Sequence, residues 1–335
     1  MRDEKFLGDN SHGATEPPVS VILTVVNEAA HLEESITAVL NSQYSGAIEI
    51  AISVGPSRDK TREIADSLAQ RDSRIKVIDN PSGRTPDGLN SAITATSHEI
   101  IVRVDGHSSI RPDYIREAVL TLKETGAVNV GGVMAAEGIT PFQRAVARAM
   151  RSPIGVGASR FHTGGSAGSV DTVYLGVFKR SALIGVGGYD SRFTRAQDWE
   201  LNYRLREKGG VIWFNPKLTV TYRPRSTFRS LARQYFEYGR WRAAVSRHHK
   251  GTANFRYLAP PINVFLQTFS LLLGTLLAPI FFIPTIIYLG AILIAALIIG
   301  KSWAERIRLP FVLIIMHFSW GFGFITSPRT LISNS

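Results

Sequence analysis

Short apolar runs alternate with amphipathic segments over roughly the first 125 residues of this chain. The runs are rich in β-branched residues and lie at 19–26, 47–54, 74–80 and 99–104. Between them, apolar residues recur three or four positions apart, as in an amphipathic helix. The helical segments lie at 30–43 and 59–70, after Thr85-Pro86, and from Arg111-Pro112 to Lys123. This order predicts an α/β fold with right-handed crossovers and a doubly wound sheet.

The pattern loosens after Gly131. Residues 170–180 are predicted to form a strand, 195–209 a helix, and 211–225 two short strands. Residues 141–152 are predicted to form a basic amphipathic helix. This helix lies either on a membrane surface or on the solvent-exposed surface of the domain. The glycine-rich stretch 155–170 is predicted to be a mobile loop that closes over a substrate, or else a plain connection.

The C-terminal part is strongly apolar. No charged residue occurs from Pro260 to Gly300, about twice the length that one membrane-spanning helix needs. Two spans are predicted at 262–281 and 285–300, and 309–326 is long enough for a third, so residues 259–328 form a region of two or three transmembrane helices. A buried helical hairpin is the soluble alternative. Residues 1–18 are predicted to be a disordered tail and residues 329–335 a short tail.

The formal net charge of +11 suggests a polyanionic partner, and there is no cysteine to form disulfides or thiolate metal sites. Arginines and aromatic residues are interleaved along 226–250, a pattern that also suits single-stranded nucleic acid. Because this segment leads directly into the apolar region, we interpret 226–258 as a basic interface helix region. Its expected partner is anionic membrane lipid on the cytoplasmic side, and no nucleic acid.

Polar residues follow several of the predicted strands. Asn27-Glu28 follows the first strand, Asp105-Gly106-His107 follows the fourth, and Gln197-Asp198 opens a later helix. Asp105 and His107 are potential metal ligands at the edge of the sheet where open α/β folds bind ligands. The alternatives are a tight turn at Asp105-Gly106 and a carboxylate at 198 that only stabilises its helix N-terminus.

In this order, the motifs resemble those of the inverting family 2 glycosyltransferases of the GT-A fold. The resemblance is strongest to the membrane-anchored type that elongates lipid-linked exopolysaccharide repeats, such as succinoglycan glucosyltransferases, and it covers residues 19–241. It implies a GT-A-type mixed sheet in a catalytic domain at 19–225. A Mn²⁺ or Mg²⁺ ion would be held by Asp105 and His107, and Asp198 would be the general base.

The resemblance also assigns the substrate-binding residues. Those expected to contact the nucleotide sugar, which we expect to be a UDP-hexose, are Val26, Asn27, Glu28, Gly55, Arg84, Asn90 and Asp105. Those expected to contact the acceptor are Gln197, Trp199, Gln234, Arg240 and Trp241. Val54-Gly55 replaces the aspartates that relatives carry after the second strand, and Leu89 replaces an arginine, for which Arg84 is the expected substitute.

We therefore predict a metal-dependent transferase that moves a sugar to a polyprenyl-diphosphate-linked saccharide. The expected location is the bacterial inner membrane, with several spans and a cytoplasmic catalytic domain. The alternatives are transfer to polyprenyl phosphate, which makes a lipid-phosphate sugar donor, and a non-catalytic nucleotide-sugar-binding protein tethered to the membrane.

Overall fold

A mixed β-sheet lies at the centre of the chain, which the computed structural model describes over residues 16–332. In that range the strand order is β3-β2-β1-β4-β8-β6-β9-β5, and β7 pairs with β9. Strands β3, β2, β1 and β4 are parallel, whereas β8 runs antiparallel to both β4 and β6. This arrangement confirms the predicted doubly wound mixed sheet. The strands are β1 (Val19–Val25), β2 (Ile48–Val54), β3 (Ile75–Asp79), β4 (Ile100–Arg103), β5 (Ser109–Ile110), β6 (Asn129–Ala136), β7 (Gly168–Ser169), β8 (Tyr174–Lys179) and β9 (Ile212–Tyr222).

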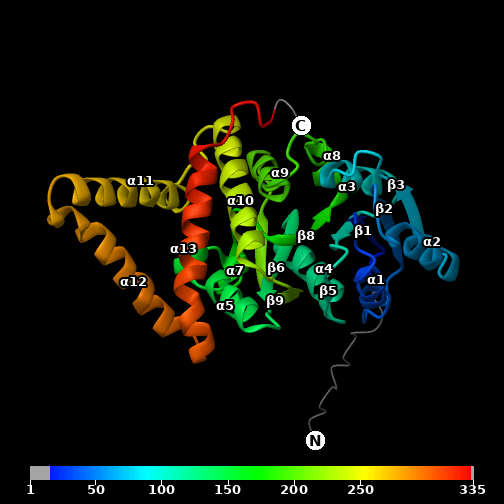
Figure 1. The fold of residues 1–335 in the computed structure, drawn as a ribbon. Coiled ribbons are helices and arrows are strands. Elements are labelled where there is room, and N and C mark those ends of the chain that lie inside the picture. The colour runs from blue at the N-terminus through cyan, green and yellow to red at the C-terminus, as the bar shows by residue number, and fades with distance from the viewer. Residues whose placement is uncertain (1–15, 333–335) are drawn as a thin grey trace, which may run out of the picture.

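Helices cover both faces of the sheet (Figure 1). Alternate residues of β1, from Val19 to Val25, pack with α1, α2 and α4, whereas Ile22 belongs to the core under α3, α8 and α9. Burial on both faces explains why the strand is apolar throughout rather than alternating. These helices are α1 (Leu32–Leu40), α2 (Thr61–Arg71), α3 (Thr85–Thr94), α4 (Tyr114–Thr125), α8 (Arg180–Gly185) and α9 (Gln197–Glu207).

The prediction of two short strands at 211–225 is wrong, because β9 is one strand of 11 residues. Its pairing with β6 jumps from Gly131↔Phe214 to Val133↔Thr219, so residues 215–218 bulge past Gly132 without ending the strand. A Cβ atom on Gly132 would lie 1.7 Å from the carbonyl oxygen of Leu218. Only glycine allows the two strands to approach so closely at this point.

The glycine-rich stretch 155–170 is not a structureless loop. It includes the last two residues of α6 (Pro153–Val156), all of α7 (Arg160–Thr163) and β7, which pairs with β9. The Nε2 atom of His317 lies 2.8 Å from the carbonyl oxygen of Ile154, which ties the residue just before this stretch to the last long helix.

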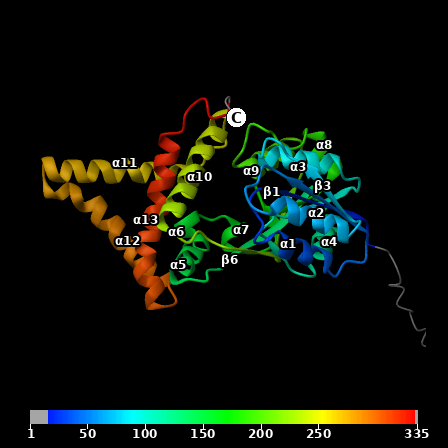
Figure 2. The same ribbon diagram turned by 45° about the vertical axis from the view of Figure 1, so that its right-hand side comes forward.

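The C-terminal part contains α5 (Pro141–Met150), α10 (Phe228–His248), α11 (Phe255–Leu276), the 3₁₀ turn η1 (Pro279–Phe282), α12 (Ile283–Ile299) and α13 (Trp303–Ile325). Three segments of the described chain, at 255–276, 279–299 and 303–325, are long and apolar enough to cross a membrane. Helices α11 and α12 project away from the sheet and leave many apolar side chains exposed, whereas α13 runs beside α10 (Figures 1 and 2). One buried cluster joins β6, α5, α10, α12 and α13, so the predicted interface helix and the third apolar helix share a core.

Most of the predicted N-terminal tail, residues 1–15, lies outside the described part of the chain, as do residues 333–335. Glu16 is described, and its carboxylate lies 2.8 Å from Nε of Arg116 on α4. The chain is therefore in contact with the domain from residue 16 onward.

Candidate active site

The loops after β1 and β2 are joined at the carboxyl edge of the sheet. Asn27 adopts a left-handed backbone with φ of 56°, and its side-chain oxygen accepts a hydrogen bond of 2.8 Å from the backbone N–H of Arg58. A Cβ atom on Gly55 would lie 2.7 Å from the side chain of Val26, so this position needs glycine. Predicted donor-binding residues from two strands thus meet at the edge where open α/β sheets bind ligands.

Arg103, the last residue of β4, connects the two acidic motifs. Its side chain is 5% exposed; Nη2 lies 3.1 Å from the carboxylate of Asp105, and Nη1 contacts the carboxylate of Asp198. The two carboxylates, predicted from separate motifs, therefore lie on one guanidinium group. Sequence reasoning missed Arg103, although an arginine at the end of an otherwise apolar strand was an available signal.

Asp198 lies in the first turn of α9, as predicted, and the residue before that helix is strained. Ala196 has φ of 58°, a conformation that residues with a Cβ atom rarely adopt. Partial burial raises the pKa of the Asp198 carboxyl, and Asp105 acts in the same direction, while Arg103 opposes both. The side chain remains 32% exposed, so a reacting hydroxyl can reach it.

His107 pairs with Glu28, the residue predicted to contact the nucleotide sugar. The Nδ1 atom of His107 lies 2.9 Å from a carboxylate oxygen of Glu28, and this contact raises the pKa of the imidazole. A carboxylate on one ring nitrogen orients the ring and leaves Nε2 directed elsewhere, which is the usual arrangement around a metal-bound histidine.

The donor set at this edge fits a divalent cation. No group of three histidine or acidic side chains in residues 16–332 forms a complete metal cage. Asp105 is 24% exposed and His107 41% exposed at the side chain, so both can reach a ligand. A cation held by two protein ligands leaves most of its coordination positions for phosphate oxygens and water, as Mg²⁺ prefers.

Two other predicted donor-binding residues have partners within the protein. The side-chain N–H of Asn90 donates to the carbonyl of Tyr189 at 2.7 Å, and the amide oxygen of Asn90 accepts from the Tyr189 backbone N–H at 2.9 Å. The guanidinium of Arg84 lies 2.8 Å from Asp87 one turn along α3. Asn90 therefore fixes the loop before α9, while Arg84 stays 37% exposed at the edge of the site.

The predicted acceptor residues divide into two groups. Gln197 and Trp199 flank Asp198, and Trp199 stacks on the guanidinium of Arg242 at 3.7 Å. By contrast, Trp241 is 5% exposed and packs in a small core with Phe193. Trp241 supports the loop before α9 and presents no open face to a sugar in this structure.

The other two predicted acceptor residues on α10 also have internal partners. Gln234 donates to the hydroxyl groups of Tyr222 and Tyr238 at 2.9 and 2.8 Å. Arg240 pairs with Glu237 at 3.0 Å. Asp105 and Asp198 meet on the guanidinium of Arg103. Among the described residues, Gln234, Arg240 and Trp241 have no such shared contact with Asp198.

Asp59 is a further acid that sequence reasoning missed near the donor edge. Its carboxylate accepts a hydrogen bond of 3.1 Å from the backbone N–H of Ala29 and also contacts the hydroxyl of Thr61. The loop after β2 thus carries an acid a few residues beyond Val54-Gly55, where relatives carry aspartates, and that acid supports the loop after β1.

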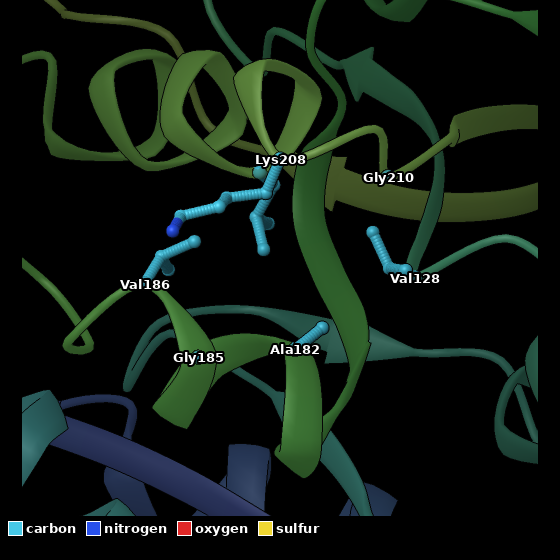
Figure 3. A pocket seen from close by; sticks show the side chains of 7 residues that line it. Val128, Ala182, Gly185, Val186, Lys208 and Gly210 are labelled. Carbon is cyan, nitrogen blue, oxygen red and sulfur yellow. The ribbon is translucent and has the colours of Figure 1, made fainter.

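A separate surface hollow lies between α8 and the end of α9. Figure 3 shows that Val128, Ala182, Gly185, Val186, Lys208 and Gly210 line it, together with Leu205. None of these residues carries a carboxylate, and Lys208 is the one charged side chain among them. The hollow therefore lacks the groups needed for the chemistry expected of Asp105 and Asp198.

Comparison with known proteins identifies relatives along nearly the whole chain. Residues 20–187 match the family described as Glycosyl transferase family 2. The chain is 31% identical over 312 residues to the succinoglycan biosynthesis protein ExoA of Rhizobium meliloti (strain 1021), covering 91% of this chain and 93% of that protein.

Two further proteins are similar over a comparable length. The dolichyl N-acetyl-alpha-D-glucosaminyl phosphate 3-beta-D-2,3-diacetamido-2,3-dideoxy-beta-D-glucuronosyltransferase of Methanococcus voltae is 24% identical over 328 residues, which cover 91% of this chain and 95% of that protein. The mannosyltransferase PcManGT from Pyrobaculum calidifontis, solved in complex with GDP-Man and Mn²⁺, has a similar fold, with a TM-score of 0.57 and 18% identity, covering 90% of this chain and 86% of that one.

Proposed function

This chain belongs to glycosyltransferase family 2, and we propose that it transfers a hexose from a nucleotide sugar to a polyprenyl-diphosphate-linked saccharide in exopolysaccharide biosynthesis. The observation that carries the proposal is the contact of Asp105 and Asp198 with the same buried guanidinium of Arg103. Because the carboxylate expected to bind the donor and the candidate base contact the same arginine, the two substrates of a transfer reaction can meet between them.

Asp198 acts as the general base in this proposal. Its carboxylate accepts the proton of an acceptor hydroxyl as that oxygen attacks the anomeric carbon from the face opposite the departing nucleotide. One displacement inverts the configuration, as fits family 2. The raised pKa of Asp198 brings the carboxylate nearer to the pH at which a base works best.

Asp105 and Nε2 of His107 would hold a divalent cation, with Glu28 orienting the imidazole. When bound, such a cation neutralises charge that develops on the leaving diphosphate. The chain's own contribution is to present one oxygen and one nitrogen ligand beside the base and to fix both carboxylates through Arg103. The nucleotide itself would lie over the joined loops at Asn27 and Gly55.

The lipid-linked acceptor and the membrane location rest on the three apolar helices and on the relatives. One relative is named for succinoglycan biosynthesis, and the other for transfer to a dolichyl-phosphate-linked sugar. We infer that α11 and α12 enter the bacterial inner membrane and that the catalytic domain lies on its cytoplasmic side. Arginines of α10 would contact anionic lipid there.

Transfer of label tests this function. Membranes that contain the full-length chain are incubated with radiolabelled UDP-glucose and a lipid extract from an exopolysaccharide-producing bacterium, with or without Mn²⁺. The proposal expects an organic-soluble labelled product that needs the cation. Release of a single labelled monosaccharide by mild acid would instead indicate transfer to polyprenyl phosphate. The assay is repeated with other labelled hexose nucleotides, and absence of product with all of them would contradict the proposal.

A further inference from the structure

A cluster of three arginines lies where α9, which carries the proposed catalytic base, meets α10 and α11. Arg206 comes from α9, Arg242 from α10 and Arg256 from α11. The guanidinium carbon of Arg242 lies 3.7 Å from the ring centroid of Trp199 and 3.5 Å from that of Tyr257. Arg242 is thus held between an aromatic ring of the catalytic helix and one of the first apolar helix.

The cluster has more positive than negative charge. Arg242 is 4% exposed and donates one hydrogen bond, of 2.7 Å, to the carbonyl of Thr252. The only carboxylate among the described residues that pairs with the three arginines is Asp171, which lies 3.6 Å from Arg206. Burial lowers the pKa of Arg242 to about 10, and the charges of Arg256 and Arg206 act in the same direction. A buried cation without a counter-ion is costly, so an anion would stabilise this cluster.

Several buried donors of the cluster have no acceptor within the described chain. They are Nε and Nη1 of Arg242, Nε of Arg206 and the indole Nε1 of Trp199. Native proteins leave few such donors unpaired, and each one needs an explanation, of which a bound ion is one. Guanidinium groups bind phosphate oxygens through two parallel hydrogen bonds, which makes phosphate the anion that suits this donor set best.

The position of the cluster suits a phosphate at the membrane surface. Trp199 directly follows Asp198, while Arg256 and Tyr257 lie in the first turn of α11. The glycine-rich stretch also reaches this point, because a Cβ atom on Gly157 would lie 2.6 Å from the side chain of Arg256. A phosphate bound here would lie between the start of a candidate membrane span and the base.

We propose that Trp199, Arg206, Arg242 and Arg256 bind the phosphate groups of the polyprenyl-linked acceptor. This inference rests on the proposed function and adds to it the residues that hold the lipid end of the acceptor. The unpaired nitrogen atoms are buried, so in this proposal Arg256, which is partly exposed whereas Arg242 is buried, moves when the phosphate binds. In the alternative, Arg242 only clamps α9, α10 and α11 together.

Binding of farnesyl diphosphate to the full-length chain in detergent tests the site without any need for turnover. We expect farnesyl diphosphate to bind and to raise the melting temperature. Farnesol, which lacks the phosphates, should bind at least tenfold more weakly. Arg256→Gln should weaken the binding of farnesyl diphosphate at least tenfold, and Arg242→Lys should do the same because lysine keeps the charge but loses the planar fork.

Arg111→Gln is the control, since Arg111 is an exposed arginine that belongs neither to the cluster nor to the helices assigned to the membrane surface. It should leave the dissociation constant within twofold. Melting temperatures without ligand identify any variant that fails to fold. If Arg242→Lys fails to fold, the dissociation constant of Arg256→Gln tests the inference, because Arg256 is partly exposed. Equal binding by Arg256→Gln and the parent would overturn the inference.

Phospholipid is the competing source of phosphate. Competition by phosphatidylglycerol as strong as that by farnesyl diphosphate would overturn the inference in favour of bulk lipid. Arginine-dependent binding of farnesyl diphosphate by a protein that transfers no sugar would support the site and contradict the proposed function. Sugar transfer at the parental rate by Arg242→Lys and Arg256→Gln would support the proposed function and contradict the phosphate site.

Discussion

Asp105 and Asp198 both bind the guanidinium of Arg103, with Nη2 of Arg103 3.1 Å from Asp105 and Nη1 in contact with Asp198. Arg103 and Asp198 are 95 residues apart in the chain. The proposed metal-binding carboxylate and the proposed base are therefore held at a fixed separation by one rigid, planar group. The first three predictions concern this site, and the last two concern the sheet that supports it.

Replacement of Asp198 by asparagine should abolish the proton-accepting step. We expect kcat for sugar transfer to fall by about 10² to 10⁴, the usual contribution of a general base. Affinity for the nucleotide sugar should change little, as measured by calorimetry. Glu207→Gln, at the exposed end of the same helix, is the control and should keep parental activity. An Asp198→Asn enzyme as fast as the parent would exclude Asp198 as the base.

Replacement of Arg103 should change both stability and the pH profile. Because Arg103→Met leaves two carboxylates without their buried partner, the free energy of unfolding should fall by about 3 to 5 kcal/mol. The Arg103 charge lowers the pKa of Asp198, so its loss raises that pKa further. A base works only when ionised, and the acid limb of kcat should therefore move to higher pH.

Measurement of kcat against pH in Arg103→Met and the parent decides this prediction, with Arg62→Met as a control. Arg62 pairs with Asp66 on an exposed surface, where ion pairs contribute less than about 1 kcal/mol. An unchanged acid limb in Arg103→Met would show that Arg103 does not influence the base.

His107 should set the metal preference. Neutral imidazole binds Mn²⁺ better than Mg²⁺, whereas carboxylate oxygens suit both ions. We expect the parent to favour Mn²⁺ and His107→Asp to shift the ratio of Mg²⁺- to Mn²⁺-supported activity upward by about tenfold. Titration of each metal in the transfer assay gives this ratio. If His107→Asp leaves the ratio unchanged, His107 is not a ligand.

Glu49 at the N-terminal end of β2 should make stability depend on acid pH. Burial raises its pKa, but hydrogen bonds from Ser97, Ser20 and His98 outweigh burial and lower it from 4.5 to about 2. The ionised form is thus favoured by folding, and this stabilisation is complete above pH 4.5 and is lost as the pH falls to about 2. Glu49→Gln keeps one acceptor oxygen and should cost about 1 to 3 kcal/mol at pH 7, and it should flatten the acid dependence in denaturant titrations.

Glu63→Gln, an exposed acid on α2, serves as the control for Glu49 and should retain the parental pH dependence. The same acid dependence in Glu49→Gln as in the parent would contradict the assignment.

Gly88 should be required where α3 crosses β1. A Cβ atom on Gly88 would lie 2.2 Å from the hydroxyl of Thr24 and 2.6 Å from the amide nitrogen of Asn80. Gly88→Ala should therefore destabilise the fold by about 1 to 3 kcal/mol through overpacking. Gly185→Ala, where a Cβ atom meets nothing within 4 Å, should leave the melting temperature unchanged or slightly higher. Equal melting temperatures for the two variants would show that α3 moves to accommodate the added methyl group without loss of stability, which would contradict the prediction.

Local patterns in the sequence were sufficient for much of the fold. Apolar runs such as 19–26 predicted strands buried on both faces, and Thr85-Pro86 predicted the start of α3. Asp198 in a first helical turn and three apolar segments near the C-terminus were likewise predicted and are observed. These features follow from side-chain periodicity and helix signals within a few residues, which the chain carries wherever it folds.

Contacts between distant segments could not be predicted in this way. The sequence showed Arg103, but only the crossing of α9 over the end of β4 decided that it pairs with both Asp105 and Asp198. Trp241 belongs to an aromatic and basic run, yet tertiary packing buries it, while the neighbouring Arg242 lies between two rings from other helices. The continuity of β9 past Gly132 likewise depended on the register with β6. Such pairings depend on how elements pack in three dimensions, and the spacing of residues along one element carries no information about its partner.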